Sequence, residues 1–259
     1  MAHVELSPFC LGETGADSRS RLWLRGGFPD SFLASDESHS FRWRREFIST
    51  FLERDIPLLG LRVPAESLRR FWRMLAHAHG EVLNKSRLGE SLGVSHVTVG
   101  HYLDILAQTY MVRSLPPCLP NLGKRLVKSP KVYLRDSGLL HTLLGLKTEI
   151  DLRGHPVFGA SWEGFALEET LATFPEWEAS HYRTARGVEL DLVLEKGGRR
   201  LGFEFKASSA PSLTRGFHRA VEDLRPERVF VVAPVNRTYP AGEGICVCAP
   251  ENLPEAMDA

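Results

Sequence analysis

The sequence has few cysteines and no long apolar run, and both absences exclude classes of protein. Its four cysteines, at positions 10, 118, 246 and 248, form no CxxC pair and no His/Cys cluster with zinc-ligand spacing, which argues against a disulfide framework or a structural zinc site. No apolar run approaches the roughly 20 residues of a transmembrane helix, and residues 1–10 lack a basic start followed by an apolar core. We therefore expect a cytoplasmic protein with no membrane partner.

The chain also lacks net charge, with 32 basic and 32 acidic residues among 259, but the charges are unevenly placed. Residues 85–135 carry eight Lys/Arg against two acids, whereas residues 161–195 carry eight acids against two arginines. The first stretch suits a polyanion and the second suits a cation. The length favours two compact units, and a content of 43% hydrophobic and 25% charged residues is typical of a globular protein.

The first half of the chain is predicted to be mainly helical. Residues 1–40 have weak periodicity and several glycines, and are interpreted as a strand remnant plus loops. Helical patterning begins near Ser40, and Ala65–His79 carries an apolar stripe at helical spacing. That stripe is Leu68, Phe71, Trp72, Leu75 and Ala76. It indicates a packing surface and no other role.

A helix-turn-helix is predicted next. A short helix over Ser86–Leu92 is followed by a turn at Gly93-Val94, and Ser95 is suited to cap a second helix that runs to about Thr109. The strands Val112–Leu115 and Lys131–Leu134 can pair around the loop Pro116–Pro130. Two strands with a basic loop after such helices form a wing, so the pattern predicts a winged helix.

The winged helix supplies the candidate DNA contacts. His96, Thr98 and His101 lie on the polar face of the second helix, opposite the apolar side chains. The wing loop adds Lys124, Arg125 and Lys128. Phosphate affinity grows with the number of cations that reach the backbone, which favours DNA as the partner. The alternative is a helical packing unit that touches no nucleic acid.

A mixed sheet flanked by helices is predicted after residue 160. The expected elements alternate in the order helix, three strands, helix and two strands. They are Ser161–Thr173, Ala179–Arg183, Glu189–Leu194, Leu201–Ala207, Leu213–Leu224, Arg228–Ala233 and Gly244–Cys248. The apolar run Val229–Val232 indicates a strand covered on both faces. The whole chain is thus expected to be α+β or α/β.

Two neighbouring strands carry the acids that suggest chemistry. Alternation places Glu189 and Asp191 on one face and Leu190, Leu192 and Leu194 on the other. In the next strand, Glu204 and Lys206 lie opposite Leu201, Phe203 and Phe205. A hairpin turn through residues 196–198 would then bring Asp191, Glu204 and Lys206 to one face.

Asp191 and Glu204 are candidate ligands of Mg²⁺, which accepts one or two protein carboxylates and keeps several waters. A neighbouring Lys206 could orient the attacking water or stabilise charge on phosphate, and Glu163 in the preceding helix could assist. These parts suit phosphodiester hydrolysis. The alternative is the solvated face of an amphipathic hairpin, because an Asp followed by Glu-x-Lys also arises by chance.

Several short motifs occur in order along the chain: Arg25–Pro29, Arg54-Asp55, Val94–Leu103, Lys124–Tyr133, Asp136–Leu139, Trp162–Phe165, Glu189–Asp191 and Glu204–Lys206. Together they resemble the motifs of a large prokaryotic family of predicted AAA-type ATPases with a C-terminal domain of unknown function. The resemblance implies a P-loop ATPase module, a winged helix and a PD-(D/E)XK nuclease-like domain. It places Glu163, Asp191, Glu204 and Lys206 at the nuclease-fold positions.

The sequence departs from that family in one respect. It has no GxxxxGK[ST] motif, so no binding or hydrolysis of ATP is expected from this chain alone. The stretch His3–Phe9 resembles the end of the ATPase region, which indicates a truncated relative or a fragment. The expected domains are residues 1–60 (ATPase remnant and helical linker), 61–150 (winged helix) and 151–259 (nuclease-like domain).

Two functional hypotheses follow. The first is a DNA-binding protein with a Mg²⁺-dependent nuclease centre. The second is a non-catalytic DNA-binding or regulatory module in which the nuclease fold is a scaffold. Under either hypothesis the partners to consider are DNA, a P-loop ATPase and a second copy of the chain.

Overall fold

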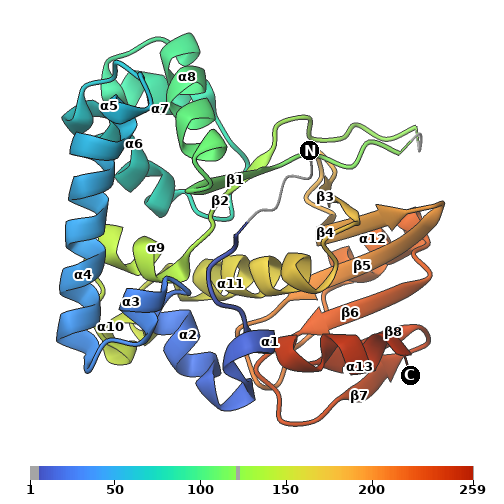
Figure 1. Ribbon diagram of the computed structural model, residues 1–259. Helices are drawn as coiled ribbons and strands as arrows, with labels where there is room; N and C mark the ends of the chain where they lie inside the picture. The colour runs from blue at the N-terminus through green and yellow to red at the C-terminus, as the bar shows by residue number, and fades with distance from the viewer. Residues whose placement is uncertain (1–5, 121–122, 259) are drawn as a thin grey trace. The chain divides into compact units, whose positions relative to one another are not determined.

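The structure is a computed structural model that describes residues 6–120 and 123–258 (Figure 1). The chain forms two compact units, one of residues 1–77, 85–111 and 134–157 and the other of residues 78–84, 112–133 and 158–259. Two sequence predictions fall partly outside the described residues. These are residues 3–5 of the presumed ATPase remnant and residues 121–122 of the wing loop.

The first unit is helical. Its α-helices are α1 Leu11–Thr14, α2 Arg19–Arg25, α3 Pro29–Phe32, α4 Glu37–Thr50, α5 Ile56–Leu58, α6 Ala65–His77, α7 Lys85–Leu92, α8 His96–Gln108, α9 Ser137–Leu143 and α10 Glu149–Arg153. A 3₁₀ turn, η1 Ala16–Ser18, precedes α2, and a π-helical turn, η2 Phe51–Asp55, joins α4 to α5. The predicted stripe of α6 is confirmed, since all five of its side chains are buried. Within residues 6–120 and 123–258, no helix has both the length and the apolar character needed to cross a membrane.

The strand remnant expected in residues 1–40 is wrong for residues 6–40, because the structure has α1, α2 and α3 there. Each helix is only four to seven residues long, too short for a 3.6-residue period to stand out in the sequence. Gly15 and Gly26, both with positive φ, end α1 and α2. Glycine tolerates that conformation and stops a helix, so these two glycines, which suggested loops, are helix ends.

The helix-turn-helix elements are confirmed. Helix α7 spans Lys85–Leu92, and Ser95 caps α8 by accepting a hydrogen bond from the N–H of Thr98 at 3.1 Å. The predicted inner face of α8, formed by Val99, Tyr102, Leu103 and Leu106, is buried.

Two of the family-like motifs contact each other inside the first unit. The carboxylate of Asp136 accepts hydrogen bonds from the N–H groups of Gly27 at 2.8 Å and Leu139 at 2.7 Å. The buried guanidinium of Arg44 donates to the carbonyl of Gly138 at 2.8 Å. A Cβ on Gly138 would lie 2.1 Å from the carbonyl oxygen of Arg25, so only glycine allows this close approach.

The second unit is built on a six-stranded sheet with the order β3-β4-β5-β6-β8-β7. The strands are β3 Glu178–Arg183, β4 Glu189–Lys196, β5 Arg199–Phe205, β6 Arg228–Val232, β7 Tyr239–Gly242 and β8 Ile245–Cys248. Strands β5, β6 and β8 run parallel, and the other pairs are antiparallel. The mixed sheet after a helical part confirms the α+β class. The edge strand β7 was not predicted, because its Pro240 and Gly242 are unusual in strands and its side chains are exposed.

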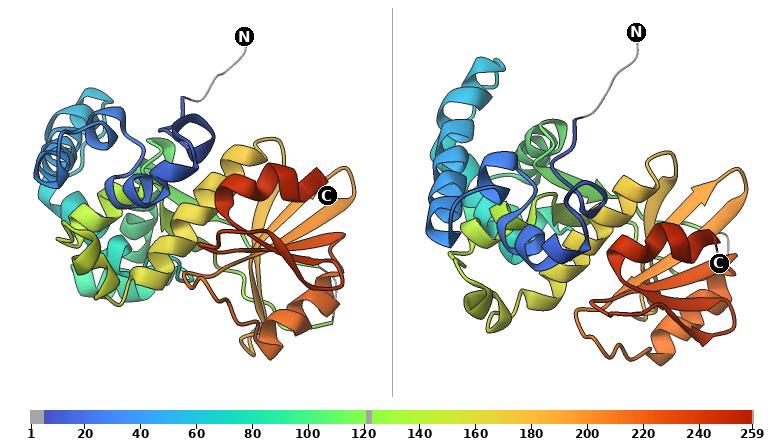
Figure 2. Two further views of the ribbon diagram at one scale, coloured as in Figure 1. Left: turned by 90° about the horizontal axis from the view of Figure 1, so that it is seen from below. Right: turned by 60° about the horizontal axis from the view of Figure 1, so that its bottom comes forward.

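Helices cover both faces of this sheet. The helices of the unit are α11 Phe158–Thr173, α12 Arg215–Leu224 and α13 Leu253–Asp258, with a 3₁₀ turn η3 Pro250–Asn252. Figure 2 shows α12 and α13 on opposite faces. On the α12 face, Phe217 and Ala220 pack in one core with Val229 and Val231, and on the other face the indole of Trp162 in α11 donates to the carbonyl of Val232 at 3.3 Å. The predicted strand Val229–Val232 is therefore covered on both sides.

The strand pair predicted as a wing is also present. Strands β1 Val112–Leu115 and β2 Lys131–Leu134 form a two-stranded sheet, and all of it except Leu134 belongs to the second unit. Helices α7 and α8 belong to the first unit. The elements of a winged helix are thus all found, while their assembly into one domain stays a prediction.

A β-bulge corrects the predicted alternation of β4. Ser180 pairs with Val193, but Tyr182 pairs with Leu190, so β4 has one residue more than β3 in this interval. As a result Leu190 packs with Val193 in the core beneath α12. Leu190 was predicted to share a face with Leu192, and that prediction is wrong because the extra residue reverses the alternation.

Candidate functional site

A buried lysine on β2 forms the centre of the acidic cluster. The ammonium of Lys131 lies 3.0 Å from Oε1 of Glu163, 2.5 Å from Oε1 of Glu189 and 3.3 Å from Oδ1 of Asp191. Its side chain is only 2% exposed. The phenol of Tyr133, two residues along β2, donates to the same Oε1 of Glu163 at 2.6 Å. One ammonium therefore joins β2 to α11 and β4.

The bulge in β4 positions Asp191. The β4–β5 pairing ends at Leu192 and Phe203, and beyond it the N–H of Phe205 donates to Oδ2 of Asp191 at 3.0 Å. The side-chain carboxylate thus takes the place of a strand carbonyl. Both oxygens of Asp191 accept hydrogen bonds from the protein, one from β5 and one from Lys131.

The predicted Glu-x-Lys pair lies at the end of β5. Lys206 donates to Oε1 of Glu204 at 2.6 Å, and its backbone N–H bonds to the carbonyl of Val232 at 3.0 Å. Glu204 is buried, and both Asp191 and Glu163 raise its pKa. The four predicted residues Glu163, Asp191, Glu204 and Lys206 therefore occupy one neighbourhood.

Burial and mutual repulsion perturb the titration of these groups. Desolvation, with a contribution from Asp191, raises the pKa of Glu163 to about 7 and that of Glu204 to about 8. Burial disfavours the charged form of Lys131, but the carboxylates of Glu163 and Asp191 raise its pKa well above the ordinary value. Lys131 is therefore charged at neutral pH.

The charges of the cluster do not balance when every group is ionised. Four carboxylates, of Glu163, Glu189, Asp191 and Glu204, face Lys131 and Lys206, and Arg183 adds a third cation by contacting Glu189 at 2.7 Å. Four negative charges against three positive charges leave one excess negative charge. This excess of negative charge, together with burial, raises the pKa values of Glu163 and Glu204.

This arrangement does not fit a Mg²⁺ ligand set. Among residues 6–120 and 123–258, no three His, Cys, Asp or Glu side chains are grouped so that they could hold an ion. Lys131 lies between Glu163 and Asp191, and Asp191 already has a protein donor on each oxygen. The oxygen donors have the right chemistry for Mg²⁺, but a fixed ammonium stands among them, so the metal stays a prediction.

The sequence analysis missed Lys131 and Tyr133 as members of this site. One signal was available, because Lys131 and Tyr133 are two residues apart on one strand and therefore share a face. All four residues of β2 are buried, and a lysine in such a strand needs a partner. The partners come from positions 32, 58 and 60 residues further along the chain, which local patterns do not reveal.

A histidine explains one glycine of the site. The ring of His79 packs edge-on against Tyr133 with 5.4 Å between ring centroids. A Cβ on Gly164 would lie 2.1 Å from Nε2 of His79. Gly164, next to Glu163 in the motif Trp162–Phe165, is therefore needed so that α11 can approach this ring.

The structure also places the candidate DNA contacts. His96 and His101 of α8 are exposed, and the side chain of Thr98 lies against that of Ser95 at 2.9 Å. In the wing loop, Arg125 and Lys128 are exposed, whereas Lys124 forms an ion pair with Asp223.

The basic stretch of residues 85–135 therefore offers fewer cations to a ligand than its sequence suggests. Besides Lys124, Lys131 is buried among acids, and Arg113 binds Glu168 through two hydrogen bonds, of 2.5 and 2.7 Å. Three of the eight cations thus stabilise the fold.

Comparisons with known proteins place the chain among uncharacterised relatives. Residues 16–150 match the model of a domain of unknown function, DUF8612, and residues 158–251 match a second domain of unknown function, DUF4143. Uncharacterized proteins of Mycobacterium bovis and Mycobacterium tuberculosis are each 44% identical over 242 residues, which is 93% of this chain and 55% of the relative. The chain thus spans about half the length of the curated relatives it matches. No solved structure matches it.

Proposed function

We propose that this chain, which belongs to the DUF8612 family, is a DNA-binding module whose nuclease-like centre is closed by Lys131 and does not cut DNA unaided. The observation that carries the proposal is the position of the Lys131 ammonium, within 3.3 Å of Glu163, Glu189 and Asp191. It supplies the positive charge that a metal would otherwise supply.

DNA binding is supported by the exposed cations and by the helix-turn-helix elements. Arg125 and Lys128 are exposed in the loop between β1 and β2, and Lys85 and Arg87 are exposed on α7. The capped start of α8 presents N–H groups and the exposed His96, a suitable arrangement for a phosphate or a base edge. Binding through such groups is mainly electrostatic and falls steeply with salt.

A second candidate function is a Mg²⁺-dependent phosphodiesterase in the same unit. It is favoured by the pair Glu204 and Lys206 at 2.6 Å and by the proximity of Asp191. Clusters of residues with perturbed pKa are common at catalytic sites. This candidate requires that Lys131 leave the acids, for instance when the chain acts with a P-loop ATPase or with a second copy of itself.

One experiment separates the two candidates. Fluorescence anisotropy with labelled duplex and single-stranded DNA, in EDTA and across a salt series, measures binding, and plasmid incubation with Mg²⁺ or Mn²⁺ measures cleavage. We expect salt-dependent binding in EDTA and no cleavage with either metal. Cleavage that is lost in Asp191→Ala would favour the phosphodiesterase, and no retention of any DNA at low salt would refute both candidates.

A further inference from the structure

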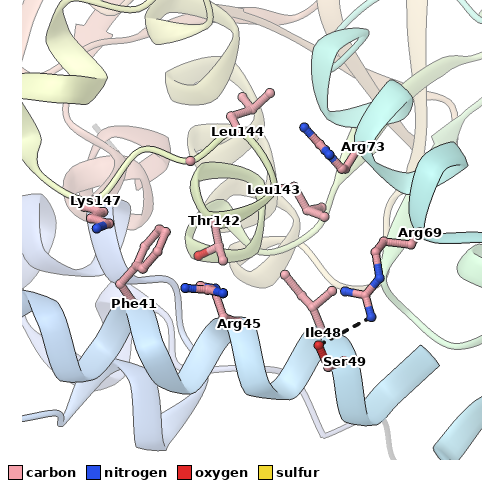
Figure 3. A pocket seen from close by; sticks show the side chains of 11 residues that line it. Phe41, Arg45, Ile48, Ser49, Arg69, Arg73, Thr142, Leu143, Leu144 and Lys147 are labelled. Carbon is pink, nitrogen blue, oxygen red and sulfur yellow. Dashed lines mark hydrogen bonds between the residues drawn. The ribbon is translucent and has the colours of Figure 1, made fainter. Parts of the chain in front are cut away.

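A cationic cavity lies in the first unit, and none of the groups assigned above lines it. Its volume is about 430 Å³, which falls within the range of small-molecule sites, roughly 300–1,000 Å³. Helix α4 supplies Arg45, helix α6 supplies Arg69 and Arg73, and the turn after α9 supplies Lys147 (Figure 3). Among the residues that line the cavity there is no acid.

The cations of the cavity are only partly compensated. Arg69 contacts Glu53 at 2.8 Å and Glu66 at 3.8 Å, and it donates to Ser49. Within the part of the chain that the structure describes, neither Arg45 nor Arg73 has an ion pair, and both are exposed. At least two arginines therefore lie around one cavity without a counter-charge.

Lys147 adds a third cation, whose charge the carboxylate of Asp151 offsets in part. Its ammonium lies 5.4 Å from the centre of the Phe41 ring, a favourable contact that leaves the charge in place. The carbonyls at the end of α9 do not offset the charge, because those of Leu140, His141 and Thr142 already accept N–H groups within the turn. Three like charges around one hollow repel each other, and an anion would relieve this repulsion.

We propose that this cavity binds a small organic phosphate with at least two negative charges. Guanidinium groups match phosphate oxygens in charge and in hydrogen-bond geometry. The walls between the cations are apolar, formed by Phe41, Ile48, Leu143 and Leu144, so part of the ligand is an apolar or aromatic group. The hollow is open to solvent and its volume suits a small molecule, whereas duplex DNA needs an extended surface. The inference is independent of the proposed DNA-binding function.

Binding is tested by isothermal titration calorimetry and phosphorus NMR with pyrophosphate and phenyl phosphate, at constant ionic strength and with sulfate as a control. The double variant Arg45→Gln/Arg73→Gln removes both unpaired arginines, and we expect it to weaken binding by at least about tenfold, since hydrogen bonds to charged groups are the strong ones. Lys147→Gln gives an independent variant, with a smaller loss. Arg42→Gln is the matched control, because Arg42 is an exposed arginine of the same helix that does not line this cavity.

Tighter binding of phenyl phosphate than of sulfate, lost in the double variant and kept in Arg42→Gln, supports the proposal. Equal losses in the double variant and in Arg42→Gln would overturn it, because they would show general charge attraction. Absence of binding at 10 mM probe, on the order of the weakest useful affinity, would also overturn it. So would a double variant that loses affinity for a duplex DNA oligomer alone. A thermal melt of each variant checks that the unit remains folded.

Discussion

Replacement of Lys131 by methionine removes the cation at the centre of the acidic cluster and keeps most of the side chain's apolar volume. In Lys131→Met, the carboxylates of Glu163, Glu189 and Asp191 lose their shared ammonium. They remain close to one another, with Asp191 buried and Glu163 and Glu189 half-buried, and Arg183 is the other cation on Glu189. We therefore expect a large loss of stability in the second unit at neutral pH.

The magnitude follows from the burial of the partners. Breaking a buried ion pair by removing one member costs about 3–5 kcal/mol. Lys131 is 2% exposed and has three carboxylate partners. We therefore expect the cost for this variant to lie in the upper part of that range. A loss of about 4 kcal/mol lowers Tm by roughly 8–16 °C for a domain of this size. The loss is smaller at pH 5, because protonation of Glu163, whose pKa Lys131 holds down in the wild type, then relieves part of the repulsion.

Urea unfolding of the wild type and the variant at pH 5 and pH 8 measures both effects. Lys196→Met is the matched control, because Lys196 pairs with Glu176 on the surface and exposed pairs contribute about 0–1 kcal/mol. Mn²⁺ added to Lys131→Met should raise its Tm more than that of the wild type, since the vacated acids can then accept a cation. A variant as stable as Lys196→Met at pH 8 would refute the central role of Lys131.

The remaining predictions concern single features of the two units. Glu204→Gln should flatten the pH dependence of stability. A carboxyl with an ordinary pKa of 4.5 and a folded pKa of about 8 binds its proton more tightly in the folded state, so the wild type loses unfolding free energy as pH rises between these values. A variant with the same pH profile as the wild type in urea melts would show that Glu204 is not the titrating group. Arg125→Glu/Lys128→Glu should weaken binding of every duplex. It should also reduce the slope of log binding constant against log salt concentration by roughly 2, about 0.9 for each lost phosphate contact. An unchanged slope in the anisotropy assay would show that DNA binds elsewhere. Gly138→Ala should destabilise the first unit by about 2 kcal/mol or more, because the new Cβ would lie 2.1 Å from the carbonyl oxygen of Arg25. Gly159→Ala is the control, since a Cβ at Gly159 would meet open space. Equal melting temperatures of the two variants would contradict this contact.

Most elements of the second unit could be predicted from the sequence because they have clear local patterns, with β7 and α13 as exceptions. The apolar run Val229–Val232 and the two-glycine turn after Lys196 both have the expected structure. The bulge at Asp191 could not be predicted, because it depends on how β4 pairs with β3. It changed the side on which Leu190 packs and brought Asp191 to the N–H of Phe205. In the first unit, the short helices α1–α3 escaped prediction because each has fewer than two full turns in which a period can show.

For the site, sequence patterns identified the acids but not the group that compensates for them. Glu163, Asp191, Glu204 and Lys206 could be found because they lie in elements with recognisable order. Lys131 could not be assigned, because it belongs to a stretch rich in Lys and Arg, where a lysine is expected to be exposed. Only the fold shows that this lysine is buried among acids.

The position of Lys131 accounts for both the stability of the centre and its proposed inactivity. The acids of the cluster repel each other in a buried site, and the ammonium of β2 offsets this repulsion at all pH values below its raised pKa. A metal ion that enters the cluster must displace the ammonium of Lys131. DNA near the cluster adds negative charge, so moving this ammonium away then costs more free energy. Under the proposed function, the closed arrangement is therefore favoured for the chain by itself, and cleavage would require that Lys131 leave the acids. Lys131→Met separates these cases, because it removes the barrier to the metal without requiring a partner.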